Sequence, residues 1–457
     1  MRSLSTLALA LPLAAAVTSP LYNAQQEQDI SSYPWLLPRD EPFVDHNLAT
    51  RATDDAFWAK AASTAGRKVC IVRPDPKGGD DAPAIMDALN ENCRSNSFVV
   101  FPGPTYNIKS NMTTTALDDV IIHHFGRFLW STDIPYWLSV SMPIGFQNQS
   151  TAWYFGGNNV QFFGHGVGTL DGNGQVWYDW AKNQGNLHRR PMMINWRKLT
   201  NSVVSGVRFV QSQFWTMAIT YSQHVELRDI YVNNTSASKW NTLNTDGCDT
   251  IWSDDITFRR WKVTQGDDSI ALKGNSSNIR VLDSEFWGGQ GLAIGSVGQY
   301  DGKYEYISNF YANNITMHHT AHAIYLKSWG GVSRGYPPNG GGGGIGVASN
   351  ITVENINLEG TRESPFFIWQ CENYEGHLGE DCQTSKFKFQ NVKGNNIFGW
   401  TNDRVDQVAH LQCSKAAGGC NDVTLTNFNI KRGQNGKPSQ NYHCENVHDA
   451  HGFKCTS

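Results

Sequence analysis

The chain has 457 residues, a formal net charge of −4 and only 17% charged side chains, which excludes a broad basic face of the kind that binds nucleic acid. This length exceeds that of one ordinary compact globule, although a solenoid grows lengthwise without needing a larger core. Glycine (43 residues) and aromatic side chains (12%) are abundant, and this composition suits an all-β protein of short strands and tight turns.

The first 19 residues are predicted to be a secretory signal. Arg2 gives a positive start, residues 4–17 are largely apolar, and small residues suited to cleavage follow. A membrane anchor is the alternative, but the apolar run is too short to span a bilayer. We therefore expect a secreted, extracellular protein without membrane contact. Candidate N-glycosylation sequons agree with export, although some of their asparagines are expected to be buried in turns; they are Asn111, Asn148, Asn233, Asn234, Asn275, Asn314 and Asn350.

Residues 20–66 are predicted to be irregular and to pack along the outside of the fold. A short amphipathic helix is predicted after them, over residues 84–89, with Pro83 in its first turn. The preceding Asp80-Asp81 is interpreted as the helix cap and not as a catalytic pair. Such a helix is expected to cover the open end of a solenoid.

Nine cysteines in an exported chain predict disulfides with one thiol left over. Cys248 is the predicted unpaired cysteine, interpreted as a small buried apolar residue rather than a reactive thiol. The spacing of Cys and His residues does not resemble a zinc site. Short loops predict the four pairs Cys70–Cys93, Cys371–Cys382, Cys413–Cys420 and Cys444–Cys455.

From about residue 120, short alternating apolar runs recur, each opened by a polar turn that often contains asparagine. Period-two alternation inside a longer repeat indicates stacked strands; the positions taken as equivalent are Val203, Val225, Ile256 and Ile279, at steps of 22, 31 and 23 residues. A propeller would need a longer and more regular repeat. We predict a single-stranded right-handed parallel β-helix over residues 67–430, followed by a disulfide-bonded tail at 431–457.

Three aspartates recur on the period of the repeat. Asp267 follows Asp246 by 21 residues and is followed at once by Asp268, so stacked turns would gather the three carboxylates on one face. Hydrolysis of a glycosidic bond needs one protonated carboxyl group and one ionised carboxylate, and crowding of like charges separates their pKa values. A calcium site or turn-capping acids remain the alternative, because Asp54-Asp55 and Asp254-Asp255 show that acidic doublets also occur elsewhere.

Four ordered motifs resemble the polygalacturonase family, glycoside hydrolase family 28: Asn244-Thr245-Asp246-Gly247, Gly266-Asp267-Asp268, Gly289-Gln290-Gly291 before Ile294-Gly295-Ser296, and the final Lys327. The resemblance covers about residues 65–430 and implies a metal-independent, inverting parallel β-helix hydrolase of pectin backbones, without a cofactor. It implies that Asp267 is the general acid, that Asp246 and Asp268 activate water, and that Lys327 binds a substrate carboxylate. Candidate substrate-binding residues are Asn244, Gln290, Lys327, Tyr325 and Lys273.

The chain departs from the pattern of that family at three places. Gln290 stands where the family has histidine, so an acid tuned by that histidine must be tuned otherwise here. Tyr325 stands where the family has arginine, which removes a bidentate grip on a carboxylate. Ser269 and Phe286 replace both halves of a family disulfide. His322, near Tyr325 in sequence, is a possible substitute for the motif histidine from another turn.

The missing arginine favours a neutral deoxysugar over a galacturonate. We predict an exo-acting α-L-rhamnosidase that releases terminal rhamnose from rhamnogalacturonan, with Lys327 holding galacturonate across the scissile bond. An exo-polygalacturonase that releases terminal galacturonate is the alternative, because Lys273 could supply the missing cation; a lyase and a non-catalytic glycan-binding β-helix are more remote. The partner is a pectic polysaccharide or oligosaccharide, and the protein is expected to be a monomer. Aromatic residues expected to wall the cleft or to pack are Trp240, Trp252, Trp329, Tyr304, Tyr306 and Tyr336.

Overall fold

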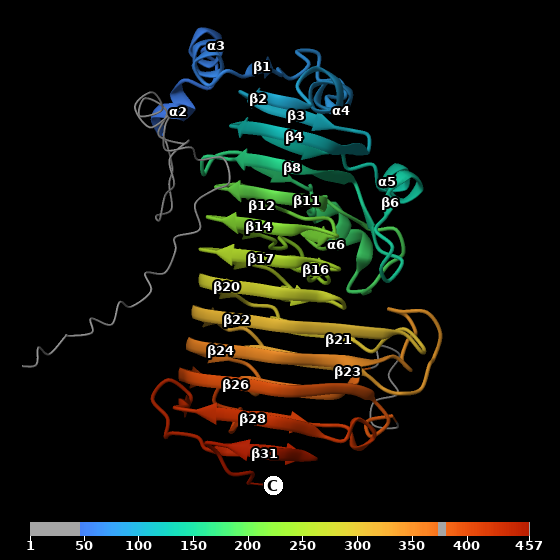
Figure 1. Ribbon diagram of the computed structural model, residues 1–457, viewed down its shortest axis with the longest axis vertical. Coiled ribbons are helices and arrows are strands. Elements are labelled where there is room, and N and C mark those ends of the chain that lie inside the picture. Colours follow the sequence, from blue (N-terminus) through green and yellow to red (C-terminus); the bar gives the residue numbers. More distant parts are fainter. Residues whose placement is uncertain (1–45, 373–380, 457) are drawn as a thin grey trace, which may run out of the picture. The chain divides into compact units, whose positions relative to one another are not determined.

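The computed structural model of the protein describes residues 46–372 and 381–456, so the predicted signal segment lies outside the described residues. Parallel strands stack in successive coils along a right-handed β-helix, as the sequence predicted (Figure 1). A small additional sheet contains β6 (Met142–Pro143), β7 (Ser150–Thr151) and β10 (Pro191–Met192). In the described part of the chain, no helix combines the length and the apolar character needed to cross a bilayer.

Each coil contributes strands to up to three stacked faces. The face that carries the candidate site contains β13 (Met217–Thr220), β16 (Cys248–Ile251), β19 (Asp268–Leu272), β21 (Gly291–Val297), β23 (Ile324–Trp329), β25 (Phe366–Glu372), β27 (Gln407–Gln412) and β30 (Asn441–Glu445). A second face contains β14 (Gln223–Arg228), β17 (Asp254–Arg259), β20 (Ser276–Trp287), β22 (Tyr304–His318), β24 (Ile345–Thr361), β26 (Lys386–Thr401), β28 (Cys420–Thr426) and β31 (Val447–His451).

Shorter strands complete the coils. They are β3 (Thr105–Ile108), β5 (Arg127–Trp130), β9 (Thr169–Asp171), β12 (Arg208–Val210), β15 (Tyr231–Asn233), β18 (Lys262–Thr264) and β29 (Asn429–Arg432). The first coils are built from β1 (Lys68–Ile71), β2 (Ser95–Phe101), β4 (Met112–His124), β8 (Trp153–Phe163) and β11 (Ile194–Ser205).

Inward-facing apolar side chains stack from coil to coil and form the core. Ile256 pairs with Val225 on one side and with Ile279 on the other, and all three are buried, which confirms their predicted equivalence. The extension of this column to Val203 is wrong, because Ser202 is the partner of Val225. Strand side chains alternate between faces, so this one-residue shift turns Val203 away from the core.

Asparagine ladders mark one of the turns between faces. Asn278, Asn309, Asn350 and Asn391 all have positive φ angles, a conformation that asparagine tolerates better than most residues. The side-chain amides of the last three donate to the oxygen of the preceding asparagine at 2.9, 3.0 and 2.6 Å, and that of Asn278 donates to Asp254 Oδ1 at 2.7 Å. The predicted role of the recurring asparagines in turns is therefore confirmed.

The N-terminal end is more helical than predicted. Residues 46–66 contain α2 (His46–Thr50) and α3 (Asp55–Thr64) in place of an irregular segment. The alanine-rich run of α3 favours a helix, Asp54 caps it by accepting from Phe57 N at 3.0 Å, and Trp58 is fully buried.

The helix predicted near residues 84–89 is present as α4 (Ala82–Asp87), continued by a π-helical turn at Ala88–Asn92. It lies at the N-terminal end of the stack (Figure 1). Asp81 occupies the cap position but accepts hydrogen bonds from Asp75 N and Asn107 N, whereas Asp80 accepts from Ala82 N. Two further short helices are α5 (Ile134–Val140) and α6 (Gln175–Ala181), and a 3₁₀ turn spans Lys415–Ala417.

The solenoid continues past residue 430, where the sequence predicted a separate tail. β30 pairs in parallel with β27, and β31 pairs with β28, so the segments Asn441–Glu445 and Val447–His451 add strands to the last coils. All four predicted disulfides are present, and Cys248 is a buried free thiol.

One candidate sequon is incompatible with a glycan on the folded chain. Asn234 is 2% exposed; its side-chain oxygen accepts from Ser212 N, and its amide donates to Thr216 Oγ1 and Thr245 O. In contrast, Asn148 and Asn314 are exposed. Modification at the exposed sequons stays a prediction.

Candidate active site

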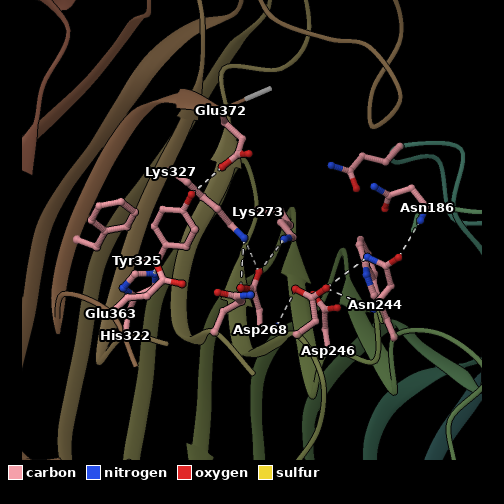
Figure 2. A pocket seen from close by; sticks show the side chains of 15 residues that line it. Asn186, Asn244, Asp246, Asp268, Lys273, His322, Tyr325, Lys327, Glu363 and Glu372 are labelled. Atoms are coloured by element: carbon pink, nitrogen blue, oxygen red, sulfur yellow. Dashed lines mark hydrogen bonds and ion pairs between the residues drawn. The ribbon is translucent and has the colours of Figure 1, made fainter. Parts of the chain in front are cut away.

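A pocket of about 370 Å³ lies over the face built from β16, β19, β21, β23 and β25 (Figure 2). All three predicted catalytic aspartates and all five predicted substrate-binding residues line this pocket. The lining also contains residues that the sequence did not suggest. The complete set is Gln147, Asn186, Trp215, Asn244, Asp246, Asp267, Asp268, Lys273, Gln290, His322, Tyr325, Lys327, Glu363, Phe367 and Glu372.

The stacking of coils brings the three aspartates together. Gly247 N donates to Asp268 O at 2.9 Å, and Gln290 N donates to Asp267 O at 2.7 Å, so these segments occupy equivalent places on successive coils. One carboxylate oxygen from each of Asp246, Asp267 and Asp268 lies within 4.8 Å of the others. The spacing of 21 residues therefore brings Asp246 beside the Asp267–Asp268 pair, as the sequence predicted.

Asp267 occupies the rim of the cluster and is less buried than its two neighbours. Its Oδ2 accepts from the backbone and side-chain nitrogens of Asn244 at 3.3 and 3.4 Å, and its Oδ1 accepts from Asp268 N at 3.0 Å. Burial, followed by the negative charge of Asp268, raises the pKa of Asp267 to about 6. This carboxyl group is therefore suited to carrying a proton in mildly acidic solution.

Asp246 is 3% exposed. Burial and the charges of Asp267, Asp249 and Asp268 raise its pKa well above the ordinary value. Its Oδ1 has no hydrogen-bond partner among the described residues. A buried polar atom of this kind normally has a partner, and its place in the pocket lining makes a water molecule or a sugar hydroxyl a suitable one.

Asp268 is held by two lysines, as Figure 2 shows. Lys327 Nζ donates to Asp268 Oδ1 and Oδ2 at 3.2 and 2.9 Å, and Lys273 Nζ lies 3.7 Å from Asp268 Oδ2. Lys273 also donates to Gly295 O at 2.9 Å. Both ammonium groups predicted to bind substrate are therefore already engaged with protein acceptors.

A fourth buried acid, Asp249, was missed by the sequence reasoning. It is fully buried, its Oδ1 lies 3.1 Å from Lys273 Nζ, and burial raises its pKa to about 7. Four aspartates facing two lysines leave excess negative charge, which protonation of a carboxyl group relieves. Lys273 could have indicated this buried acid from the sequence. A lysine that directly follows the apolar strand segment Ile270–Leu272 needs an acidic partner when it is buried.

His322 lies in the pocket lining on the coil after Gln290, and its backbone N–H donates to Gln290 O at 3.0 Å. Its ring is 4.6 Å from that of Phe367 and stacked on it, and its Nδ1 is 2.8 Å from Ser364 O. Burial lowers the pKa of His322 to about 4. The neighbouring His318 instead stacks on Trp287 and pairs with Glu359, so it does not join His322 in a metal site.

Apart from Tyr325, the Trp, Tyr and Phe side chains in the pocket lining are not the predicted ones. Trp215, Tyr325 and Phe367 line it, and Tyr325 donates its hydroxyl to Glu372 Oε2 at 2.8 Å. The six aromatics proposed from the sequence are all absent from the lining. Trp329, for example, is the last residue of β23, and only 2% of it is exposed.

Loops from distant parts of the chain form a wall at one end of the pocket, and Gln147 lies at its centre. Gln147 Nε2 donates to Gln299 Oε1 at 2.6 Å, and Gln147 N donates to the Tyr300 hydroxyl at 2.9 Å. In the same wall, Asn186 N donates to Asn244 Oδ1 at 2.7 Å, and Asn339 Nδ2 donates to Asn186 O at 3.4 Å. These contacts fix the wall against the aspartate cluster.

The cluster of three carboxylates has the composition of a cation site, yet we expect activity to survive metal removal. Lys273 and Lys327 already place positive charge beside Asp268. Turnover after dialysis against a chelator should match that of the untreated protein within error. A loss of activity that Ca²⁺ or Mg²⁺ restores would contradict this expectation.

The comparisons with known proteins agree with this geometry. The model of glycosyl hydrolases family 28 matches residues 139–455. An α-L-rhamnosidase of Aspergillus niger, rgxB, is 44% identical over 85% of this chain and 90% of its own length. A putative galacturan 1,4-α-galacturonidase A of Aspergillus flavus is 37% identical over 85% of this chain and 94% of its own. The crystal structure of an endo-xylogalacturonan hydrolase of Aspergillus tubingensis superposes with a TM-score of 0.71 at 22% identity, covering 85% of this chain and 99% of that chain.

Proposed function

Because this chain belongs to glycosyl hydrolases family 28 and is a pectin-degrading glycosidase, we propose that it removes single rhamnose residues from the non-reducing end of rhamnogalacturonan. The observation that carries this proposal is the charge of the pocket. Its lining contains no arginine, and both of its lysines pair with aspartates. A terminal sugar without a carboxylate fits such a pocket better than galacturonate does.

Tyr325 supports the same choice. Its ring lies 5.0 Å from His322 and 5.1 Å from Phe367, so three flat side chains form one side of the pocket. Aromatic surfaces of this kind pack against the apolar face of a sugar. The similarity to the α-L-rhamnosidase of Aspergillus niger also supports a rhamnose substrate.

The wall of the pocket supports action at a chain end. The side chains of Gln147 and Asn186 lie at the end of the pocket beyond Asn244, where a longer substrate would need to continue. A volume of about 370 Å³ is near the lower limit for ligand pockets. The pocket therefore suits one terminal residue and the beginning of the next.

In the proposed reaction, Asp267 gives its proton to the glycosidic oxygen as the bond to the anomeric carbon breaks. Asp268, which is paired with Lys327 and Lys273, takes a proton from a water molecule that Asp246 orients, and the oxygen of this water forms the new bond to the anomeric carbon on the opposite face. The carboxylate oxygens lie within 4.8 Å of one another, closer than the roughly 6.5–9.5 Å that is typical of inverting pairs. We propose that the attacking water lies at the edge of the cluster, in contact with both Asp246 and Asp268, and not between Asp267 and one distant base.

The pKa of Asp267 sets the expected pH dependence. A general acid acts only while it is protonated, so kcat/KM should fall as pH rises through about 6, the pKa of Asp267. The limiting slope above that value is about tenfold per pH unit. A pH profile with the rhamnose-capped substrate measures this, and full activity retained at pH 8 would remove Asp267 from the role of acid.

We also propose that the protein is secreted and acts as a monomer. Four disulfides support an oxidising destination.

The substrate is tested with two matched oligosaccharide series, one of rhamnogalacturonan capped by rhamnose and one of polygalacturonate. Chromatography of early products should show free rhamnose and a series shortened by one residue. Free galacturonate from the second series would favour the galacturonidase alternative that the Aspergillus flavus relative suggests. Internal fragments would contradict action at the chain end, and unsaturated sugars would indicate a lyase.

A further inference from the structure

A column of outward-facing rings continues from the pocket toward the C-terminal end of the solenoid. Tyr325 pairs in register with Phe367, Phe367 with His410, and His410 with His443, on the successive strands β23, β25, β27 and β30. All four side chains are partly exposed. The first two belong to the pocket lining, so the column is continuous with the candidate active site.

The rings form one contiguous surface, which we call the ring platform, made of Phe367, Trp369, His410 and His443. Phe367 lies 5.0 Å from His410 and 5.8 Å from Trp369, and His410 lies 4.6 Å from His443, between ring centroids. Trp369 pairs with Lys327 on β23 and follows Phe367 by two residues on β25. Its side chain therefore lies on the same face of the strand as Phe367, beside the column. The surface is two rings wide near the pocket.

We propose that the ring platform binds the sugar residues of the substrate that follow the scissile bond. This inference rests on the proposed exo-action, because a pocket walled by Gln147 and Asn186 lets the remaining polymer leave only on the opposite side. The platform begins on that side, at Phe367. Its occupant is therefore the leaving-group part of a pectic oligosaccharide.

The spacing of the platform matches a sugar chain. Neighbouring strands lie about 4.8 Å apart, which is close to the length of one hexose residue. Each coil after β23 thus offers one ring per step along the stack: Phe367, then His410 at 71° to it, then His443 at 46° to His410, so the column presents ring edges as well as ring faces. Flat rings bind the faces of sugars by stacking, and this contact requires no pairing with a sugar carboxylate.

The charge of the platform agrees with this mode of binding. Burial and the neighbouring His443 lower the pKa of His410 to about 4, so its imidazole is neutral in mildly acidic solution. Glu363 and Glu372 line the pocket, and Glu445, two residues after His443 on β30, accepts from Gln383 Nε2 at 2.6 Å. Recognition there thus rests on ring surface and hydrogen bonds more than on cations.

The test measures KM, kcat and calorimetric affinity of the full chain for substrates of increasing length, from a rhamnose-capped disaccharide to a hexasaccharide. In the unchanged protein, KM should fall with each added residue until the platform is filled. His410→Ala should raise KM for long substrates roughly 2- to 10-fold and leave the disaccharide unchanged, whereas Trp369→Ala, on the same strand as Phe367, should also raise KM for the disaccharide. His443→Ala should affect only the longest substrates. Tyr304→Ala, which removes a 59% exposed ring outside the pocket lining, is the matched control.

Two results would overturn the proposal that the ring platform binds substrate. One is a KM that does not change with length in the unchanged protein or in the variants; the other is an equal loss for short and long substrates, which indicates a structural role. Measurements on the polygalacturonate series in parallel separate a failure of the ring platform from a failure of the proposed rhamnose substrate. If galacturonate is released instead of rhamnose, the proposed substrate fails, while the length dependence of binding still decides the fate of the platform.

Discussion

Asp267→Asn is expected to lower kcat by roughly 10²- to 10⁴-fold, the usual contribution of a general acid. Asparagine keeps the size of the side chain, and its one amide oxygen can still accept from Asp268 N, although its NH2 group replaces the oxygen that accepts from Asn244. It has no proton to give to a leaving oxygen. The loss should therefore appear in kcat, with thermal unfolding close to that of the unchanged protein.

The matched control for this variant is Asp255→Asn. Asp254-Asp255 is also an acidic doublet, but Asp255 pairs with His224 and Arg280 away from the pocket. We expect its kcat to be unchanged. Substrates with a very acidic leaving group need little protonation, so an activated aryl rhamnoside should recover much of the activity of Asp267→Asn. Equal loss on both kinds of substrate would count against the acid role.

Lys327→Met should be the second most damaging change, and it distinguishes two roles for this lysine. Lys327 bonds to both oxygens of Asp268, and the side chains are 7% and 2% exposed. Breaking a buried ion pair costs about 3–5 kcal/mol of folding free energy. Loss of this partner also removes the group that fixes the water-activating carboxylate. We therefore expect a lower unfolding temperature together with a fall in kcat.

If Lys327 only bound a substrate carboxylate, KM would rise while kcat and stability stayed the same. Steady-state kinetics with calorimetric unfolding separates the two roles. Lys262→Met is the control, because Lys262 is exposed on β18, outside the pocket. A variant at Lys327 that matches this control in all three quantities would show that the ion pair with Asp268 has no catalytic importance.

The fold and the aspartate cluster were predictable because they depend on a repeat that the sequence displays. Alternating apolar residues define each strand, and the 21-residue step places Asp246 beside Asp267. The same reasoning misplaced the equivalent position at Val203 by one residue, because it took the apolar Val203 as the inward side chain, whereas the buried Ser202 pairs with Val225. It also ended the solenoid too early, since the last strands are short and interrupted by polar turns.

Other parts of the site depend on contacts that no local pattern encodes. Gln147 meets Gln299 across 152 residues of sequence, and only the folded chain shows that these loops meet at the pocket. The ion pair between Lys273 and Asp249 could not be predicted from the sequence for the same reason. The ring platform requires the register of β25, β27 and β30, whereas the aromatics that stood out in the sequence are absent from the pocket lining, some buried like Trp329 and others exposed like Tyr304.

Time-resolved proton NMR of a rhamnose-capped rhamnogalacturonan oligosaccharide tests the central claim most directly, because one spectrum reports the sugar released and its first anomeric form. Asp267 as acid, with water activated by Asp246 and Asp268 in a walled pocket, predicts that free β-L-rhamnose appears first and then equilibrates with the α form. Initial α-L-rhamnose, initial galacturonate or internal cleavage would contradict the account.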